Sequence, residues 1–511
     1  MSEKNKNIDS LAKSLELVEV DTRDSVNMLR DDILMSVLRG ALTRNDNELV
    51  EKCERLYHDW YPRGVLDKED ETPVDATLLI GPPGHGKTTS FKVALKEVAN
   101  GLGLTYLENA EINRQQQTEE GITRNHLCFV SQETAGIVSS LEWAGLPAED
   151  KIKSNTHADG ERAAMGRLFD ARLLALEESA GGVLLLDDFL NASPQIQNVG
   201  LSISEEKRFG SLSLDNACVG LTGNMGSVDG THTTRASTAL RNRCKIFFIQ
   251  DHWKNFLSRA HSDPRYRDEV GLAGVDGFLE RRSQSFFSEP DPKMMGGYNT
   301  PRSWMKYLNE ARRTINRFGG RANMSDALPA LGRLARSLLG PQVGYDLTVY
   351  MRSLADLADP LARKVIREGT LDTEMLAKKF KDGYSADEHH FAYQYANALA
   401  DYTAQKVIED KGDLKVAVER FTVGMSPLTG SSFTHGMNVF KQRLANHVES
   451  LSEKVKDGER QLSFDACAKI TAIVAESPLV NARQIQDMVD ALSDWDKMKS
   501  LPSTPVRRQK K

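Results

Sequence analysis

The chain has 511 residues, enough for two or three domains, and its 40% hydrophobic and 27% charged residues are ordinary for a soluble globular protein. No stretch approaches the roughly 18 apolar residues that a membrane-spanning helix needs, and the N-terminal segment lacks the apolar run of a secretory signal. Five scattered cysteines without a CxxC pair predict reduced thiols and a cytoplasmic protein. The formal net charge of −6 argues against electrostatic binding of the chain as a whole to nucleic acid.

The hydrophobic pattern changes twice along the chain. Apolar residues at helical spacing, among them Leu29, Ile33 and Val37, predict helices from residue 1 to about 60. From about Asp75 to Ile249 short apolar strands alternate with helical stretches, which is typical of a parallel α/β sheet. Helical periodicity dominates after residue 250. The expected strands are Ala76–Ile80, Leu104–Leu107, Val183–Leu186, Ala217–Thr222 and Lys245–Ile249.

A glycine-rich stretch follows the first expected strand and precedes a helical one. It matches G-x-x-x-x-G-K-[ST] at Gly81, Gly86, Lys87 and Thr88. Glycines allow positive φ and let backbone N–H groups converge on phosphate oxygens, and a helix beginning at Lys87 points its positive end at them. We expect Lys87 to contact the β- and γ-phosphates of ATP and Thr88 to ligate Mg²⁺. The expected nucleotide-binding residues are Gly81, Pro82, Pro83, Gly84, His85, Gly86, Lys87, Thr88 and Thr89.

An acidic pair ends the apolar run that begins at Gly182. Such a run reads as a strand buried on both faces, and strands of this kind end at the ligand-binding edge of an α/β sheet. Asp187 is expected to hold Mg²⁺, and Asp188 stands where the general base or the water-positioning carboxylate belongs. An aspartate at the turn after a strand is common and is weak evidence by itself. Together with the phosphate-binding loop, it indicates a nucleotide site.

The wider pattern resembles MoxR-type AAA+ ATPases. The segment from Asp187 to Gln197 is similar to the one that follows the acidic motif in that family, and Val219 to Asn224 resembles its sensor 1 strand. The stretch before the last expected strand resembles its arginine-finger segment, with Arg243 in the usual position and Arg241 as a rival. Thr300-Pro-Arg-Ser-Trp resembles the sensor 2 element, which places Arg302 on the nucleotide.

The resemblance implies a fold, an activity and an assembly. The fold is an AAA+ core with a parallel five-stranded sheet in the order 5-1-4-3-2 and a helical lid. The activity is Mg²⁺-dependent ATP hydrolysis with Asp188, Asn224, Arg243 and Arg302 as catalytic residues, coupled to remodelling or assembly of a protein partner. A homo-oligomer, most simply a ring of six, and a client with a von Willebrand factor A domain are also implied. The predicted division is a helical N-terminal region (1–55), the α/β core (56–250), the lid (251–325) and a helical C-terminal region (326–511).

Asp188 departs from the family pattern, because the family usually has Glu at this position. Aspartate is shorter by one methylene, and a general base must lie within about 3 Å of the water that it polarises. A slow or partner-stimulated enzyme is therefore expected.

Two other functions remain open from the sequence. The chain fits a nucleic-acid motor, although it is acidic and shows no recognisable DNA-binding motif. It also fits an ATP-gated assembly protein with little turnover, because of Asp188. The sequence does not indicate the client.

Overall fold

The computed structural model describes residues 18–371, apart from 67, 69–71, 138–145, 154–160, 210–211, 227–232, 234–235, 264, 267–269, 289–295 and 321–322, and scattered residues between 392 and 440. The described chain divides into two compact units. The first holds the residues up to Asn255 together with Ser288 and Thr300–Arg302, and the second holds Phe256–Phe287, Gly296–Asn299 and the residues from Ser303 onward. The four-part division expected above stays a prediction.

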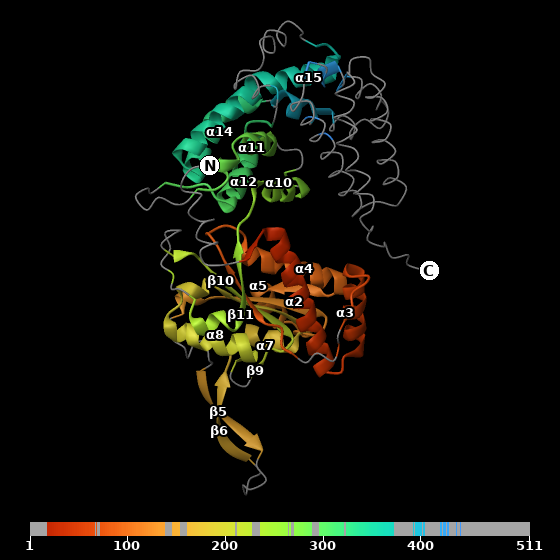
Figure 1. Cartoon of the computed structure of the whole chain (residues 1–511), viewed down its shortest axis with the longest axis vertical. Coiled ribbons are helices and arrows are strands. Elements are labelled where there is room, and N and C mark those ends of the chain that lie inside the picture. Colours follow the sequence, from red (N-terminus) through yellow and green to blue (C-terminus); the bar gives the residue numbers. More distant parts are fainter. Residues whose placement is uncertain are drawn as a thin grey trace, which may run out of the picture. The chain divides into compact units, whose positions relative to one another are not determined.

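The first unit is built on a mixed α/β architecture with a parallel sheet of seven strands (Figure 1). The order across the sheet is β1-β11-β2-β10-β7-β4-β3, and each neighbouring pair runs parallel. The strands are β1 (Val18–Val20), β2 (Ala76–Ile80), β3 (Thr105–Glu108), β4 (His126–Glu133), β7 (Gly181–Asp187), β10 (Ala217–Gly223) and β11 (Cys244–Ile249).

The prediction of five strands in the order 5-1-4-3-2 was wrong. The strand β4 lies between β7 and β3. The second of the five expected strands, which is observed as β3, is therefore at the edge of the sheet and not next to β7, and β1 extends the opposite edge. Both additions are weak signals in the sequence. Only the first half of β4 is apolar, and β1 is three residues long inside a segment that reads as helical. The helical prediction was therefore wrong for Val18–Val20, and residues 1–17 lie outside the described part of the chain.

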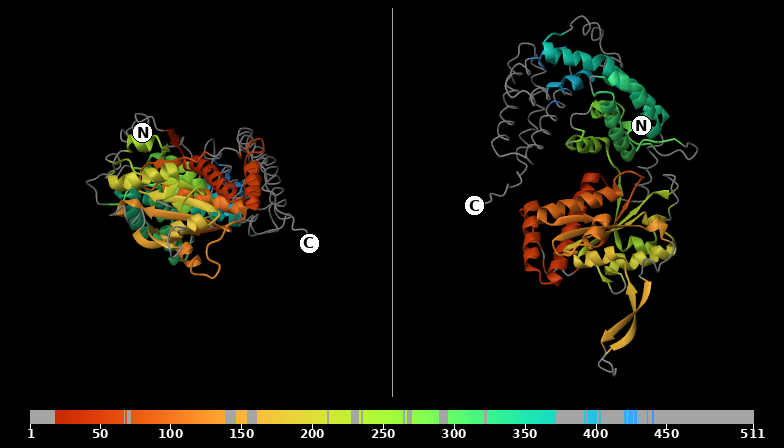
Figure 2. Two further views of the ribbon diagram at one scale, coloured as in Figure 1. Left: turned by 90° about the horizontal axis from the view of Figure 1, so that it is seen from below. Right: turned by 180° about the vertical axis from the view of Figure 1, so that it is seen from behind.

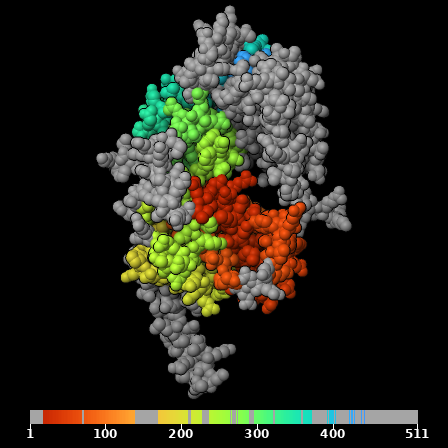
Figure 3. Space-filling model, viewed as in Figure 1, coloured from red at the N-terminus to blue at the C-terminus, as the bar shows by residue number. Residues whose placement is uncertain are grey.

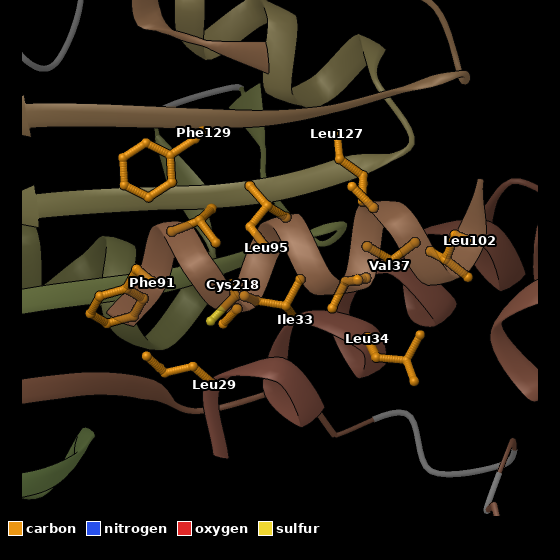
Figure 4. Packing of buried hydrophobic residues seen from close by; sticks show 14 of the residues in the cluster. Leu29, Ile33, Leu34, Val37, Phe91, Leu95, Leu102, Leu127, Phe129 and Cys218 are labelled. Atoms are coloured by element: carbon orange, nitrogen blue, oxygen red, sulfur yellow. The ribbon is translucent and has the colours of Figure 1, made fainter. Parts of the chain in front are cut away.

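Helices cover both faces of the sheet and form two separate cores. On one face, α2 (Thr22–Thr43) and α4 (Lys87–Leu102) bury Leu29, Ile33, Phe91 and Leu95 against the strands (Figure 4). The helix α3 (Asn47–Trp60) packs against α2 and α4 in the same core. The N-terminal segment, drawn in red and orange-red, forms much of the visible surface of this unit (Figure 3). The other face is covered by α5 (Asn109–Gln115), α7 (Ala171–Glu178) and α8 (Pro194–Glu206). The sheet is thus buried on both sides, which explains the unbroken apolar run of β7.

Local signals explain where these helices begin. The Asp21 carboxylate accepts hydrogen bonds from the backbone N–H groups of Arg23 and Asp24 at the start of α2, both at 2.8 Å. Ser193 caps α8, and Pro194 occupies its first turn. These are preferred residues at helix N-termini, because a side-chain oxygen satisfies the first N–H groups and proline has no N–H to leave unpaired.

Two antiparallel pairs complete the first unit. The hairpin of β5 (Leu146–Lys153) and β6 (Glu161–Leu168) extends away from the sheet (Figures 1 and 2). The short pair β8 (Arg208–Phe209) and β9 (Leu212–Ser213) follows α8.

The described residues of the second unit form helices joined by loops. It contains α11 (Val270–Arg281), α13 (Met324–Leu339), α14 (Pro341–Ser353), α15 (Asp359–Glu368) and most of α10 (Trp253–Ser262) and α12 (Pro301–Arg317). Trp304 is fully buried in its core and donates its indole N–H to the carbonyl of Phe286 at 3.0 Å. No helix in the described part of the chain has the length and apolar composition to cross a lipid bilayer.

Candidate nucleotide site

The phosphate-binding loop connects the end of β2 to the start of α4. Gly84 and Gly86 have φ angles of +82° and +88°, which L-residues with a side chain rarely adopt. The helix α4 then begins directly at Lys87. The first N–H groups of a helix have no intrahelical acceptor. The positive end of the α4 dipole, with these N–H groups, therefore faces the loop and any anion bound there. The local geometry is that of an anion-binding turn.

Lys87 is buried, and three oxygen atoms surround its ammonium group. Its Nζ donates to the carbonyl oxygens of Gly81 at 2.7 Å and Pro82 at 3.1 Å, and to Oδ1 of Asn224 at 2.9 Å. A buried ammonium requires such acceptors, because its desolvation is otherwise very costly. Phosphate oxygens are stronger acceptors of the same kind.

The Asp187 carboxylate at the end of β7 accepts hydrogen bonds from one hydroxyl group of α4 and one of β10. Thr88 donates from Oγ1 to both oxygens of the Asp187 carboxylate at 3.0 Å, and Thr222 at the end of β10 donates to Oδ1 of the same carboxylate. A hydroxyl and a carboxylate are oxygen donors of the kind that Mg²⁺ prefers, and this ion is usually held by one or two carboxylates together with substrate phosphates. The described residues hold no cluster of three or more His, Cys, Asp or Glu suited to a metal ion. The hydroxyl of Thr88 and the carboxylate of Asp187 are residues that could hold a magnesium ion together with the phosphates of a nucleotide.

Asp188 adopts a left-handed backbone conformation with φ 52° and ψ 35°. Its N–H donates to Oγ1 of Thr222 at 2.9 Å, and its Oδ1 accepts from Nδ2 of Asn224 at 3.3 Å. Aspartate tolerates this conformation better than most residues, at a cost of roughly 1–2 kcal/mol. The turn places the carboxylate beside Asn224, which bridges it to Lys87.

The electrostatic environment disfavours the charged form of Asp188. Burial raises the pKa of its carboxyl above the usual range, and the carboxylates of Asp187 and Glu133 raise it further. Lys87 and Arg302 lower it without reversing the net upward shift. A raised pKa suits a group that must accept a proton during catalysis.

His85 is fully buried in the loop and is neutral. Burial lowers its pKa to about 3, and the neighbouring Lys87 charge acts in the same direction. Its Nδ1 accepts the backbone N–H of Asp251 at 3.0 Å, so the ring proton resides on Nε2. Asp251 in turn accepts a hydrogen bond from the hydroxyl of Thr22, the first residue of α2, at 2.9 Å. The N-terminal segment therefore supports the loop.

Arg302 approaches the loop from the first turn of α12, in the short segment that belongs to the first unit. A methyl group placed on Gly84 would lie 3.0 Å from Cβ of Arg302 and 3.1 Å from the hydroxyl of Thr300. The Arg302 charge also acts on Asp188. Thr89, which was also expected to bind the nucleotide, is exposed in the first turn of α4.

Arg243 lies apart from the residues above. It directly precedes β11, whose first residue Cys244 pairs with Ala76 at the amino end of β2, whereas the loop follows Ile80 at the carboxyl end. Four residues of extended strand separate the two ends by about 13 Å. Arg243 forms an ion pair with Glu205 of α8, and Arg241 is exposed at the end of a short helix (Thr238–Arg241). The loop, Asp187, Asp188, Asn224 and Arg302 are thus gathered in one place, and Arg243 is at the opposite edge of the sheet.

Three polar residues near the site were missed from the sequence. Thr222 holds both Asp187 and Asp188, and Thr134 donates its hydroxyl to the Asp187 carbonyl at 2.8 Å. Glu133 ends β4 opposite Asp187. Thr222 could have been recognised from the sequence, because it is a polar residue near the end of an otherwise apolar strand, directly before Gly223. No motif marks Thr134 or Glu133, because β4 itself was not expected.

We expect Gly84→Ala to weaken ATP binding by about tenfold or more and to lower stability by about 1–2 kcal/mol, because the new methyl group meets Arg302 and Thr300 at a positive φ. Gly121→Ala is the matched control: Gly121 has φ +63° with nothing within 4 Å of its added methyl. Calorimetric titration with MgATP and thermal unfolding separate the two effects. Equal ATP affinity in both variants would show that the close packing of Arg302 and Thr300 against Gly84 does not matter for ATP binding.

Comparisons with known proteins leave the family undefined. No family model matches the chain, and no curated protein matches it either. Among solved structures it is similar to PCH-2 of C. elegans, at 14% identity over 59% of this chain and 67% of the PCH-2 chain, with a TM-score of 0.21. A TM-score of this size supports no conclusion about fold or function. The function is therefore inferred from the loop and the sheet edge.

Proposed function

We propose that the chain is an AAA+ ATPase of the MoxR type that couples ATP binding and hydrolysis to remodelling or assembly of a protein partner. The observation that carries the proposal is the convergence of Lys87, Asp187, Asp188 and Asn224 at the carboxyl edge of a parallel sheet, directly before the N-terminus of α4. This edge is where ligands bind in open α/β sheets. The glycine-rich loop, a buried lysine and a hydroxyl–carboxylate pair match a triphosphate with its magnesium ion.

Each residue has a distinct role in the proposed reaction. Lys87 exchanges its carbonyl and amide acceptors for β- and γ-phosphate oxygens. Thr88 and Asp187 hold Mg²⁺, which supplies neutralising charge on the phosphates. Asp188 orients the attacking water. Asn224 fixes the Asp188 carboxylate and the Lys87 ammonium relative to each other, because its amide hydrogen-bonds to both. Arg302 adds positive charge at the loop.

The assembly is proposed on the same grounds. An arginine at the far edge of the sheet cannot serve its own nucleotide, so Arg243 would act on the site of a neighbouring subunit in a homo-oligomer, most simply a ring of six. A protein client, with a von Willebrand factor A domain as the first candidate, and a cytoplasmic location remain part of this proposal.

A second candidate is an ATP-gated assembly protein with little turnover. The specific observation in its favour is Asp188, whose short carboxylate is turned toward Asn224. Steady-state phosphate release by the pure protein, with and without a large excess of DNA, decides between these functions. Saturable MgATP binding without measurable turnover would favour the assembly protein, and strong stimulation by DNA would favour a nucleic-acid motor.

We expect Asp188→Asn to keep ATP affinity within about threefold and to lower turnover about 10²-fold. The variant loses the carboxylate that orients the attacking water, and activation of the water by positioned side chains contributes about 10²–10⁴-fold. Asp187→Asn should instead weaken the binding of MgATP much more than that of ATP in EDTA, because it loses a magnesium ligand. Calorimetric titrations in Mg²⁺ and in EDTA, together with phosphate release, measure both effects. If the two variants have the same profile, the division of roles between the adjacent aspartates is wrong.

A further inference from the structure

Glu133 is the last residue of β4 and lies beside Asp187 in the sheet. The parallel pairing of β4 with β7 runs without interruption from Leu127 to Glu133 and sets Glu133 against Asp187. Neighbouring strands are about 4.8 Å apart. A second acidic residue therefore ends a strand next to the one that carries the proposed magnesium ligand.

The two side chains point to the same face of the sheet. Leu127 and Phe129 of β4 pack in the core beneath α4, toward which they point in Figure 4. Side chains alternate along a strand, so Glu133, four residues after Phe129, shares their face. Asp187 faces α4 as well, because it accepts hydrogen bonds from Thr88 in the first turn of that helix.

Glu133 is held in place by its backbone while its carboxylate stays available. The next residue, Thr134, anchors the end of β4 by donating its hydroxyl to the Asp187 carbonyl at 2.8 Å. The Glu133 side chain is exposed and has no hydrogen-bond or ion-pair partner among the described residues. Asp188, by contrast, already accepts a hydrogen bond from Asn224 on the other side of Asp187.

We propose that Glu133 is a second catalytic carboxylate, which orients and deprotonates the attacking water beside Asp188. The inference rests on the proposed ATPase function. Glutamate is longer than aspartate by one methylene and supplies the reach that Asp188 lacks. The water oxygen forms a bond to the γ-phosphorus while the bond from that phosphorus to the β–γ bridging oxygen breaks. The water proton passes to the Glu133 carboxylate and then to solvent, and ADP leaves with the bridging oxygen.

The test compares Glu133→Gln with a matched substitution at Glu178. Glu178 is exposed at the end of α7, next to the amino end of β7, so Glu178→Gln makes the same charge change at the opposite edge of the sheet. Single-turnover hydrolysis, MgATP affinity by calorimetry and far-UV circular dichroism are measured for the parent and both variants. We expect Glu133→Gln to lose about 10²-fold in the single-turnover rate, with affinity and fold preserved, and Glu178→Gln to match the parent.

The outcomes separate this inference from the function on which it rests. Parent-like hydrolysis by Glu133→Gln, in a parent that binds and hydrolyses MgATP, overturns the role of Glu133 and leaves the ATPase proposal standing. A loss of MgATP affinity equal to the loss of rate also overturns it, because the residue would then serve binding. A parent that neither binds nor hydrolyses MgATP overturns both proposals.

Discussion

Lys87→Ala is expected to lower MgATP affinity at least 10²-fold. Lys87 is the buried cation of the loop, and each hydrogen bond to a charged group contributes roughly 1.5–3 kcal/mol. Losing its contacts to two phosphate groups therefore removes about 3–6 kcal/mol of binding free energy, which corresponds to about 10²–10⁴-fold in Kd. Calorimetric titration of the purified variant with MgATP measures the loss directly.

The control for this variant is Lys92→Ala in the same helix. Lys92 follows one turn after Thr88 and forms an ion pair with Glu108, with 2.7 Å between Nζ and Oε2. Removing it takes the same charge from α4 without touching the loop, so MgATP affinity should stay within about threefold of the parent. Wild-type affinity in Lys87→Ala would disprove the assignment of the loop, and equal losses in both variants would indicate a general effect of charge on the helix.

Arg243→Ala is expected to bind MgATP normally and to lose about 10³-fold or more in hydrolysis, because a trans arginine stabilises the charge that develops on the transferred phosphoryl group. The position of Arg243 is the reason to expect that the substitution lowers the rate of hydrolysis and leaves MgATP affinity unchanged. It lies at the amino edge of the sheet, opposite the loop of its own subunit, and forms an ion pair with Glu205. Phosphate release and calorimetry on the same preparation measure the two quantities.

Mixing Arg243→Ala with Lys87→Ala should restore part of the activity. A mixed ring contains sites in which the intact loop of one subunit meets the intact Arg243 of its neighbour, and neither pure ring contains such a site. Native mass spectrometry establishes that mixed oligomers form. If they form and hydrolyse no more ATP than the two parents summed, Arg243 is not a trans finger, and Arg241 becomes the residue to test in the same way.

The conformation of the loop could be predicted because its signals are local. A strand, a glycine-rich turn and a helix starting at Lys87 follow one another directly in the chain, and β2 has the expected bounds, Ala76–Ile80. The acidic pair was recognisable for the same reason, since Asp187 and Asp188 end an apolar run that is buried on both faces. Each of these features depends on neighbours in sequence, which backbone propensity and hydrophobic periodicity report.

The arrangement around that loop was decided by tertiary structure. The pairing of β4 between β7 and β3 places Glu133 beside Asp187. The pairing of β10 brings Thr222 to both aspartates and Asn224 to Asp188. The parallel pairing of β11 with β2 moves Arg243 to the far edge. Strand order and register depend on contacts between segments distant in the chain, and a one-residue change in register would turn each side chain to the other face. The sequence by itself therefore determined the strand, the glycine-rich turn and the helix that follows it, because these depend on neighbours in the chain. The pairing of the strands decided which carboxylate, hydroxyl and amide groups lie around that turn.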